Sequence, residues 1–507
     1  MQEATFTKRA AVGLRSERGP ILGSVMLTTG LVALDSTIIA TAVPSVVRDL
    51  GGFAHFPWLF SIYLLTAAVT TPLYGKLADV LGRKPVMFFG IAAFLLGSVL
   101  CGAAWSMLTL IVFRAIQGIG AGAIQPISMT IIGDLYSVEE RARVQGYVAG
   151  VWGVSSVVGP TLGGVFADYL SWRWIFFVNL PLGLFAAWMF ARHLKENVER
   201  RAHRIDYLGA GLLIAGCTLL ILATLEGGIM WAWASAPSIV IFTLGAAMIT
   251  AFVFVERRAA EPVLPLWVFR HRTLIGGNLA GVAVGALVIG LSSYIPNFSQ
   301  GVLGTSALVA GFVVAAMTLG WPIAATLSGR VYLRIGFRNT ALIGGVVIIA
   351  GTVMCALLTE ATTVAMTSVA CFVIGIGLGL AAAPTLVAVQ SVVGWDRRGV
   401  VTGTNMFSRS IGSAVGAAVF GAIANTTLER RFAAAPPDVK PSLTAGADAT
   451  TILLKAGAAP ANVVDYVRAA LYTASHNVFV ALAVVGVCGV AVILLIPRHV
   501  EKLPDGS

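Results

Sequence analysis

The stretch ILGSVMLTTGLVALDSTIIATAVP, residues 21–44, is apolar over the length of a membrane-spanning helix and carries one carboxylate, Asp35, near its middle. About 20 consecutive apolar residues cross the hydrocarbon layer of a bilayer as a helix. An ionised Asp at the centre of such a helix costs about 2.5–3.5 kcal/mol on insertion scales, so a chain that keeps one there usually uses it. Asp35 is therefore a candidate functional residue; the alternative is a buried polar side chain that a neighbouring helix satisfies.

The rest of the chain repeats this pattern. Of its 507 residues, 57% are hydrophobic and 11% are charged, and the mean hydropathy is +0.88. The apolar segments lack the two-residue alternation of barrel strands, so helices are the expected spans. The sequence predicts an all-α polytopic membrane protein with spans near residues 21–44, 57–76, 86–104, 107–131, 144–167, 174–192, 206–224, 238–256, 274–296, 306–328, 339–358, 364–391, 400–424 and 476–497.

Basic residues are distributed unevenly between the two sides of this arrangement. If the N-terminus is cytoplasmic, the connections on that side hold 25 Lys and Arg, whereas the short loops on the other side hold only Arg48 and Arg173. Because cytoplasmic loops carry the excess of Lys and Arg, both termini are predicted to be cytoplasmic. This bias accounts for most of the net charge of +11, so no nucleic acid is needed as a partner.

Neither a metal site nor enzyme chemistry is indicated. The five cysteines all fall within apolar segments, without a CxxC pair or a histidine at ligand spacing, which predicts packing roles and no metal or cofactor. No cluster of nucleophile, base and metal ligands is visible in the sequence. A membrane receptor or a lipid-modifying enzyme on a helical scaffold is the less favoured alternative.

An internal repeat divides the chain. The connections GKLADVLGRKP at 75–85 and GRVYLRIGFRN at 329–339 each place two glycines seven residues apart, at an offset of 254. GIGAG from Gly118 matches GIGLG from Gly375 at an offset of 257, and Pro44 matches Pro296 at 252. We therefore expect an N-terminal six-helix half at 1–204, an inserted helix pair at 205–258 and a C-terminal six-helix half at 259–507, since twofold repeats are usual in secondary transporters.

Five motifs in sequence order resemble one family. GKLADVLGRKP resembles the loop signature of the major facilitator superfamily, and RAIQGIGAGA at 114–123 resembles the fourth-helix motif of its proton-coupled exporters. LDSTIIATAVP at 34–44, GVSSVVGPTLGG at 153–164 and WRWIFFVNLPLG at 172–183 are similar to motifs of its 14-helix drug:proton antiporters. The resemblance implies the major facilitator fold and proton-coupled multidrug efflux across a bacterial cytoplasmic membrane.

Two ions lie at the same predicted depth in this arrangement. Asp35 lies nine residues before Pro44 and Arg114 seven residues after Met107, or about 13 and 10 Å from the outer surface at a rise of ~1.5 Å per residue. Pairing would offset the burial of both charges. Protonation of Asp35 would then release Arg114 or a hydrogen-bonded partner such as Gln117, so these three residues are predicted to couple proton entry to a change of facing state.

A second set of residues is predicted to control the conformational change. Asp79 is placed to accept from Arg83 or to face the positive end of the helix that begins near Gly399, and in the family such contacts stabilise the outward-open state. Glycines and a proline in the fifth span permit close helix packing or a kink that acts as a gate. The predicted gate residues are Gly75, Asp79, Gly82, Arg83, Gly159, Pro160, Gly163 and Gly164.

The substrate cavity is predicted between the two halves. Aromatic rings and Met suit flat cationic guests, although the same residues suit packing or the interface belt. The second half offers Arg409 near mid-depth, to balance charge or to bond to carbonyls, and no carboxylate in any span. Some relatives in the resembled family that export dications carry extra acids in the late helices, so the resemblance implies monovalent lipophilic cations or neutral amphiphiles as the cargo here. The cavity candidates are Tyr63, Trp152, Tyr294, Asn297, Gln300, Trp321, Asn405, Met406 and Arg409.

The outer segment 425–475 is longer than the other loops. Its part ANVVDYVRAALYTA, residues 461–474, has apolar residues at helical spacing and is expected to lie on the membrane surface. An envelope accessory protein is a candidate partner for this segment, and a tolerated insertion is the alternative. The motifs do not separate drug export from export of an endogenous lipid, siderophore or metabolite.

Overall fold

The computed structural model describes residues 13–51, 55–56, 58–196, 206–226, 231, 235–259, 261–440 and 460–501. Within these residues, fourteen helical segments are long and apolar enough to cross a membrane, as predicted. The helices are α1 (Gly19–Leu50), α2 (Trp58–Leu81), α3 (Arg83–Gly102), α4 (Met107–Leu135), α5 (Val138–Tyr169), α6 (Trp174–Phe177), α7 (Asn179–His193), α8 (Tyr207–Glu226), α9 (Ala236–Glu256), α10 (Arg272–Asn297), α11 (Ala307–Ile335), α12 (Phe337–Ala356), α13 (Val364–Ser391), α14 (Arg398–Ala433) and α16 (Ala461–Ile493). Short turns η2 (Leu266–Phe269), η3 (Phe298–Val302) and η4 (Trp395–Arg397) connect some of them.

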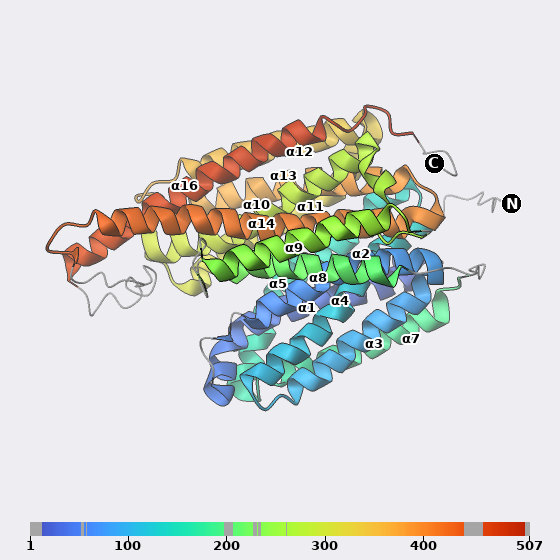
Figure 1. Cartoon of the computed structure of the whole chain (residues 1–507), viewed down its shortest axis with the longest axis horizontal. Helices are drawn as coiled ribbons and strands as arrows, with labels where there is room; N and C mark the ends of the chain where they lie inside the picture. The colour runs from blue at the N-terminus through green and yellow to red at the C-terminus, as the bar shows by residue number, and fades with distance from the viewer. Residues whose placement is uncertain are drawn as a thin grey trace.

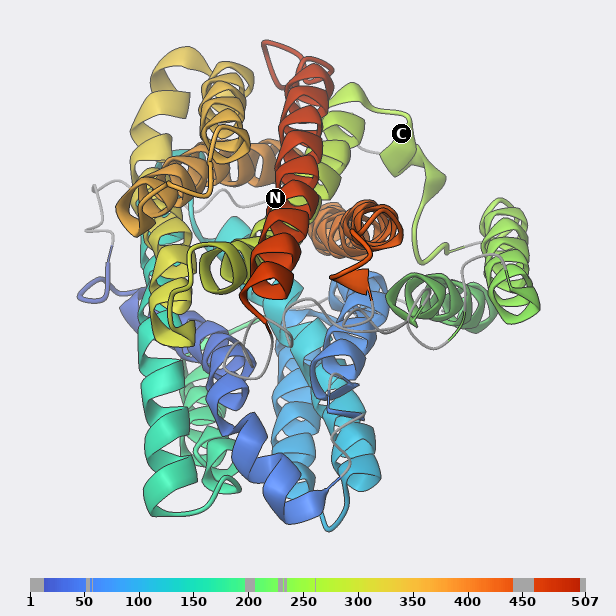
Figure 2. The ribbon, with the colours of Figure 1, turned by 90° about the vertical axis from the view of Figure 1, so that its left-hand side faces the viewer.

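The helices form two halves and a separate pair. Figure 1 shows α1, α3, α4, α5 and α7 on one side of the molecule and α10, α12, α13 and α16 on the other. The halves meet mainly where α2 packs on α14 and α5 on α11. Figure 2 shows α8 and α9, in green, beside this seam and outside both halves. The predicted boundary at residue 204 lies outside the described residues.

Each half has a hydrophobic core of its own. In the second half, buried residues between Val284 and Leu482 form one cluster. In the first half, buried residues between Leu22 and Leu194 form two clusters. A further cluster joins α2, α8 and α14. The halves are thus separate packing units, joined where α2 packs on α14 and α5 on α11.

The helix ends follow local chemistry. Ser137 accepts from the backbone N–H of Glu140, whose side chain returns to the Ser137 N–H, so α5 begins at Val138 and not at the predicted residue 144. The repeated glycines Gly82 and Gly336 have φ of 95° and 84°, a left-handed conformation that suits glycine. They make the sharp turns from α2 to α3 and from α11 to α12.

The outer segment differs from its prediction. Residues 425–433 continue α14, and α16 begins at Ala461, so residues 461–474 are one helix with the last span. The hydroxyl of Tyr466 donates to the Arg431 carbonyl at 2.5 Å, and Val463 and Val467 pack against Val439. The surface-helix expectation is wrong because the apolar face of this segment packs on the chain that follows α14. Residues 441–459 lie outside the described part.

Candidate functional site

A buried polar network surrounds Asp35. Arg114 Nη1 donates to Asp35 Oδ2 at 2.6 Å, and Gln117 Nε2 donates to Asp35 Oδ1 at 2.7 Å. The side chains of Asp35 and Arg114 are each 1% exposed, and Gln117 is fully buried. A buried ion pair is tolerated where further hydrogen bonds satisfy its remaining polar atoms. The two ions predicted to share one layer are therefore in direct contact.

Two members of the network were missed from the sequence. Asn179, at the start of α7, donates to Asp35 Oδ1 at 3.0 Å and to the Ser98 hydroxyl at 3.2 Å. Ser98, in α3, also accepts from Gln117 at 2.8 Å. Asn179 carried a signal, because it is the one amide inside the motif WRWIFFVNLPLG. A single Ser in an apolar helix, such as Ser98, carries none.

Arg114 is held from a second side. Its Nε donates to the Leu59 carbonyl at 3.1 Å and its Nη1 to Gln117 Oε1 at 2.8 Å. The guanidinium carbon lies 4.2 Å from the ring centroid of Tyr63, a cation–π contact. Tyr63 was predicted to line the substrate cavity, but it is 3% exposed. Its ring covers Arg114 and does not face an open space.

A second polar cluster joins the halves at one end of the bundle. We call the end with the α2–α3 connection at Gly82 the inner end, and the end at which α14 stops, at Ala433, the outer end. Asp79 accepts from the backbone N–H groups of Gly399 and Val400, both at 2.8 Å, at the start of α14. This is the predicted contact with a positive helix end. Gly75 permits it, because a Cβ at that position would lie 2.6 Å from the Gly399 carbonyl.

Arg83 extends this cluster. It contacts Asp79 at 3.0 Å and Asp134 at 2.8 Å, and it donates to the Trp395 carbonyl at 2.5 Å. From the other half, Arg398 contacts Asp134 at 2.5 Å. Asp134 and Arg398 were missed from the sequence. They let one carboxylate bind a cation from each half, so the inner end is closed by charge-assisted hydrogen bonds.

The predicted gate residues of the fifth span make contacts within the first half, unlike the cluster at the inner end, which joins the two halves. A Cβ at Gly159 would lie 2.0 Å from the Thr37 hydroxyl, and one at Gly163 would lie 2.3 Å from the Ile38 carbonyl. Thr41 donates to the Pro160 carbonyl at 3.2 Å. These contacts join α1 and α5 inside the first half, which favours the packing interpretation. Gly164 has no atom within 4 Å of such a Cβ.

The cavity candidates do not form one cluster. Tyr294 and Trp321 pack against the core of the second half, and Met406 packs against that of the first. Asn405 donates to the Gly277 carbonyl at 2.9 Å. Arg409 is exposed, whereas Trp152, Asn297 and Gln300 are half-buried.

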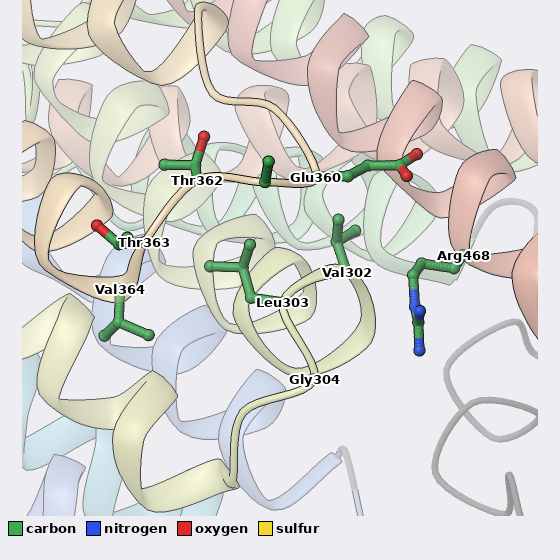
Figure 3. A pocket seen from close by; sticks show the side chains of 9 residues that line it. Val302, Leu303, Gly304, Glu360, Thr362, Thr363, Val364 and Arg468 are labelled. Atoms are coloured by element: carbon green, nitrogen blue, oxygen red, sulfur yellow. The ribbon is translucent and has the colours of Figure 1, made fainter.

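A pocket at the outer end is separate from these residues. Figure 3 shows it between the chain after η3, the α12–α13 connection and α16. It lies within the second half, and no predicted site residue lines it, so it is not the space between the halves. Its lining residues are Val302, Leu303, Gly304, Glu360, Ala361, Thr362, Thr363, Val364 and Arg468. In the described part of the chain, no group of three or more His, Cys, Asp or Glu is arranged to hold a metal ion.

Comparison with known proteins decides the family. The model of the Major Facilitator Superfamily matches residues 25–417. The chain belongs to the major facilitator superfamily. Multidrug resistance protein 3 of Bacillus subtilis (strain 168) is 36% identical over 429 residues, which cover 85% of this transporter and 83% of the relative. Multidrug transporter protein MdtP of the same organism is 35% identical over 418 residues, 82% and 77% of the two chains.

More distant relatives agree with this assignment. Efflux pump dotC of Dothistroma septosporum (strain NZE10 / CBS 128990) is 29% identical over 487 residues, 94% of this transporter and 84% of the relative. The crystal structure of the human organic anion transporter MFSD10 (TETRAN) matches with a TM-score of 0.62 over 94% of this chain and 99% of that one. At 15% identity, this likeness shows the fold alone. The predicted family and fold are confirmed, and they point to a transporter and not to an enzyme.

Proposed function

We propose that this transporter is a proton-coupled multidrug efflux antiporter that exports lipophilic compounds from the cytoplasm or inner leaflet by alternating access. Its relatives named as multidrug transporters and efflux pumps support export in general. The observation that carries the coupling is the buried pair of Asp35 and Arg114, 2.6 Å apart. The charge of the cargo is a separate matter, because it depends on the space between the halves and not on this pair.

The chemistry of coupling follows from the donors around Asp35. Ionised Asp35 accepts from Arg114, Gln117 and Asn179. A protonated carboxyl has lost its charge, so Arg114 would be a buried cation without a counter-ion, a state that costs about 3–5 kcal/mol. Movement of α1 relative to α4 relieves this cost. Protonation therefore favours a different arrangement of the helices.

The inner end supplies the other half of the cycle. We place this end, with both chain termini, on the cytoplasmic side of a bacterial cytoplasmic membrane. The reason is the distribution of basic residues: the connections on this side hold 25 Lys and Arg, and the short loops on the other side hold two. The contacts of Asp79 with Gly399 and of Arg398 with Asp134 then close the cytoplasmic side. Opening to the cytoplasm requires both to break. Proton entry at Asp35 supplies the bias for that step.

The test is drug-dependent proton movement in proteoliposomes with an imposed pH gradient. Asp35→Asn keeps the shape of the side chain but cannot exchange a proton, so gradient-driven transport of lipophilic dyes and drugs should fall to the level of empty vesicles. Asp49→Asn is the matched control: Asp49 lies on the same helix, with its side chain 48% exposed, and should transport normally.

Wild-type transport rates in Asp35→Asn would contradict the coupling mechanism. If no dye or drug moves in the wild type, while a cell-envelope lipid binds tightly, export of an endogenous compound by the same machinery replaces drug export.

A further inference from the structure

Arg409 is an unusual charge for its position. It lies in the interior of α14, far from both helix ends, and its side chain is exposed. The backbone of α14 packs on α10 at this point: a Cβ at Gly281 would lie 3.7 Å from the Arg409 nitrogen, and one at Gly285 would lie 1.9 Å from the Arg409 carbonyl. An exposed side chain beside such a contact leaves α14 at the edge of the interface with α10. Within the described residues, no hydrogen bond or ion pair involves the Arg409 side chain.

The neighbours of Arg409 on α14 place this space between the two halves. Met406, one turn earlier, packs against the core of the first half. Ser413, one turn later, donates to the Gly285 carbonyl of α10 at 3.1 Å. Arg409 lies between these two contacts, where α14 leaves the first half and follows α10. It is therefore on the wall of the central space, beyond the closed inner end.

A second donor without a partner lies nearby. Asn405, one turn before Arg409, directs its Nδ2 to the Gly277 carbonyl at 2.9 Å and lies 3.5 Å from Asn278 Oδ1. This contact fixes the orientation of the Asn278 amide, because a flip would bring two N–H₂ groups together. Asn278 is 4% exposed, and its Nδ2 has no hydrogen-bond partner in the described part of the chain. A cation and an amide donor are thus both without an acceptor.

No carboxylate of the second half is placed to satisfy them. Helices α10, α11 and α13 contain no Asp or Glu, and the only acid of α14 is Glu429, about 30 Å along the helix from Arg409 at ~1.5 Å per residue. In the first half, Asp35 is 1% exposed and is already bound by Arg114, Gln117 and Asn179. Among these described residues, no carboxylate is placed to satisfy Arg409, so a bound molecule is the acceptor that we consider.

We propose that Arg409, with Asn278 beside it, binds the carboxylate headgroup of an amphiphilic cargo. A guanidinium offers two parallel N–H donors to a carboxylate, and such charge-assisted bonds are about twice as strong as neutral ones. The apolar body of the cargo would lie along α10 and α14. This inference rests on the proposed export function, and it replaces the expectation of monovalent cations, because an exposed arginine repels them.

The test compares three headgroups on one body. The probes are 1-pyrenebutyrate, its carboxamide and 1-pyrenebutylamine, measured by tryptophan-to-pyrene energy transfer on the full-length transporter in nanodiscs at neutral pH, with empty nanodiscs subtracted. The wild type should bind the butyrate about tenfold or more tighter than the amine, since a hydrogen-bonded charge contributes that much. Arg409→Gln should remove this preference and leave the affinity for the carboxamide probe unchanged.

Three further variants sharpen the result. Arg409→Lys keeps the charge without the fork of donors and should retain part of the preference. Asn278→Leu removes one neutral donor and should weaken butyrate binding about threefold. Arg430→Gln is the control, because Arg430 is an exposed arginine in the last turn of the same helix and should have no effect.

The proposal is overturned if the wild type binds the amine as tightly as the butyrate, or if Arg409→Gln keeps the preference while Arg430→Gln matches the wild type. Binding is measured without a proton gradient. An Asp35→Asn variant that still transports would therefore contradict the proposed coupling and leave the headgroup preference standing. Loss of the headgroup preference would leave proton coupling untouched.

Discussion

In the first half, α4 crosses α2 so closely that a Cβ at Gly118 would lie 2.5 Å from the Tyr63 carbonyl. In the second half, α13 crosses α11 in the same way, and a Cβ at Gly375 would lie 2.2 Å from the Met317 carbonyl. The two glycines are 257 residues apart and the two carbonyls 254, the offsets of the sequence repeat. The halves therefore share one packing geometry, set by glycines that let backbones meet.

The chemistry inside this shared geometry is different. At the repeat offsets of 252 and 257, Asp35, Arg114 and Gln117 correspond to Leu287, Cys371 and Ile374. These three residues of the second half are at most 2% exposed and belong to its hydrophobic core. The fold is thus formed with apolar side chains where the first half places an ion pair. Apolar replacements of a buried pair are often neutral or stabilising, so we expect the first half to fold without its ions.

The largest expected effect comes from breaking this pair on one side. Arg114→Met leaves Asp35 buried without its cation and should lower the free energy of unfolding by about 3–5 kcal/mol. The double variant Asp35→Leu with Arg114→Met makes the first half resemble the second and should recover most of that loss, without proton-coupled transport. Thermal unfolding of the purified transporter in detergent measures the stability, and proteoliposomes measure the coupling.

If Arg114→Met were as stable as the wild type, water would reach the pair of Asp35 and Arg114 in solution. If the double variant were less stable than the single one, the first half would need its polar core in order to fold. In that case the comparison with the second half would fail.

The shared packing predicts equal and smaller effects in both halves. Gly118→Ala and Gly375→Ala each force a methyl group onto a backbone carbonyl and should lower the free energy of unfolding by about 1–3 kcal/mol. Gly164→Ala, where the Cβ meets no atom within 4 Å, is the control and should not lower it; the higher helix propensity of Ala should raise it by about 0.5–1 kcal/mol. Denaturation of the three variants side by side measures the difference. A large effect in only one half would show that the repeat does not extend to the energetics.

The smallest effect concerns an exposed ion pair of similar geometry. Arg173 contacts Asp49 at 2.7 Å near the outer end, and hydrogen bonds from Arg173 and then Trp172 lower the pKa of Asp49 below 3.8. Because the folded pKa is the lower one, the pair stabilises the fold above pH ~4, and this contribution is lost as the pH falls through the folded pKa. Asp49→Asn should therefore lower Tm slightly at pH 7, and its difference from the wild type should shrink as the pH falls below 3.8 and Asp49 becomes protonated in the folded state. A difference in Tm that does not shrink as the pH falls would assign the effect to packing.

Most expectations drawn from single segments were accurate. The positions of the spans followed from hydropathy, and the shared depth of Asp35 and Arg114 followed from the rise of a helix. The error at residues 461–474 has a physical reason: an apolar helical face packs equally well on lipid or on protein, so the pattern does not name its neighbour. Asn179 and Ser98 were missed because an uncharged side chain marks a site only when the neighbouring helix faces are known.

The sequence by itself determined the class of protein, the number of helices, the repeat and the family, because hydropathy, charge and motif order are properties of segments. Only the tertiary structure decided that Tyr63 covers Arg114, that Asp134 binds a cation from each half, and that Arg409 meets no acceptor among the described residues. These facts depend on how each helix is rotated about its axis and on which distant segments become neighbours. Local patterns leave both undetermined, since several rotations bury nearly the same apolar area.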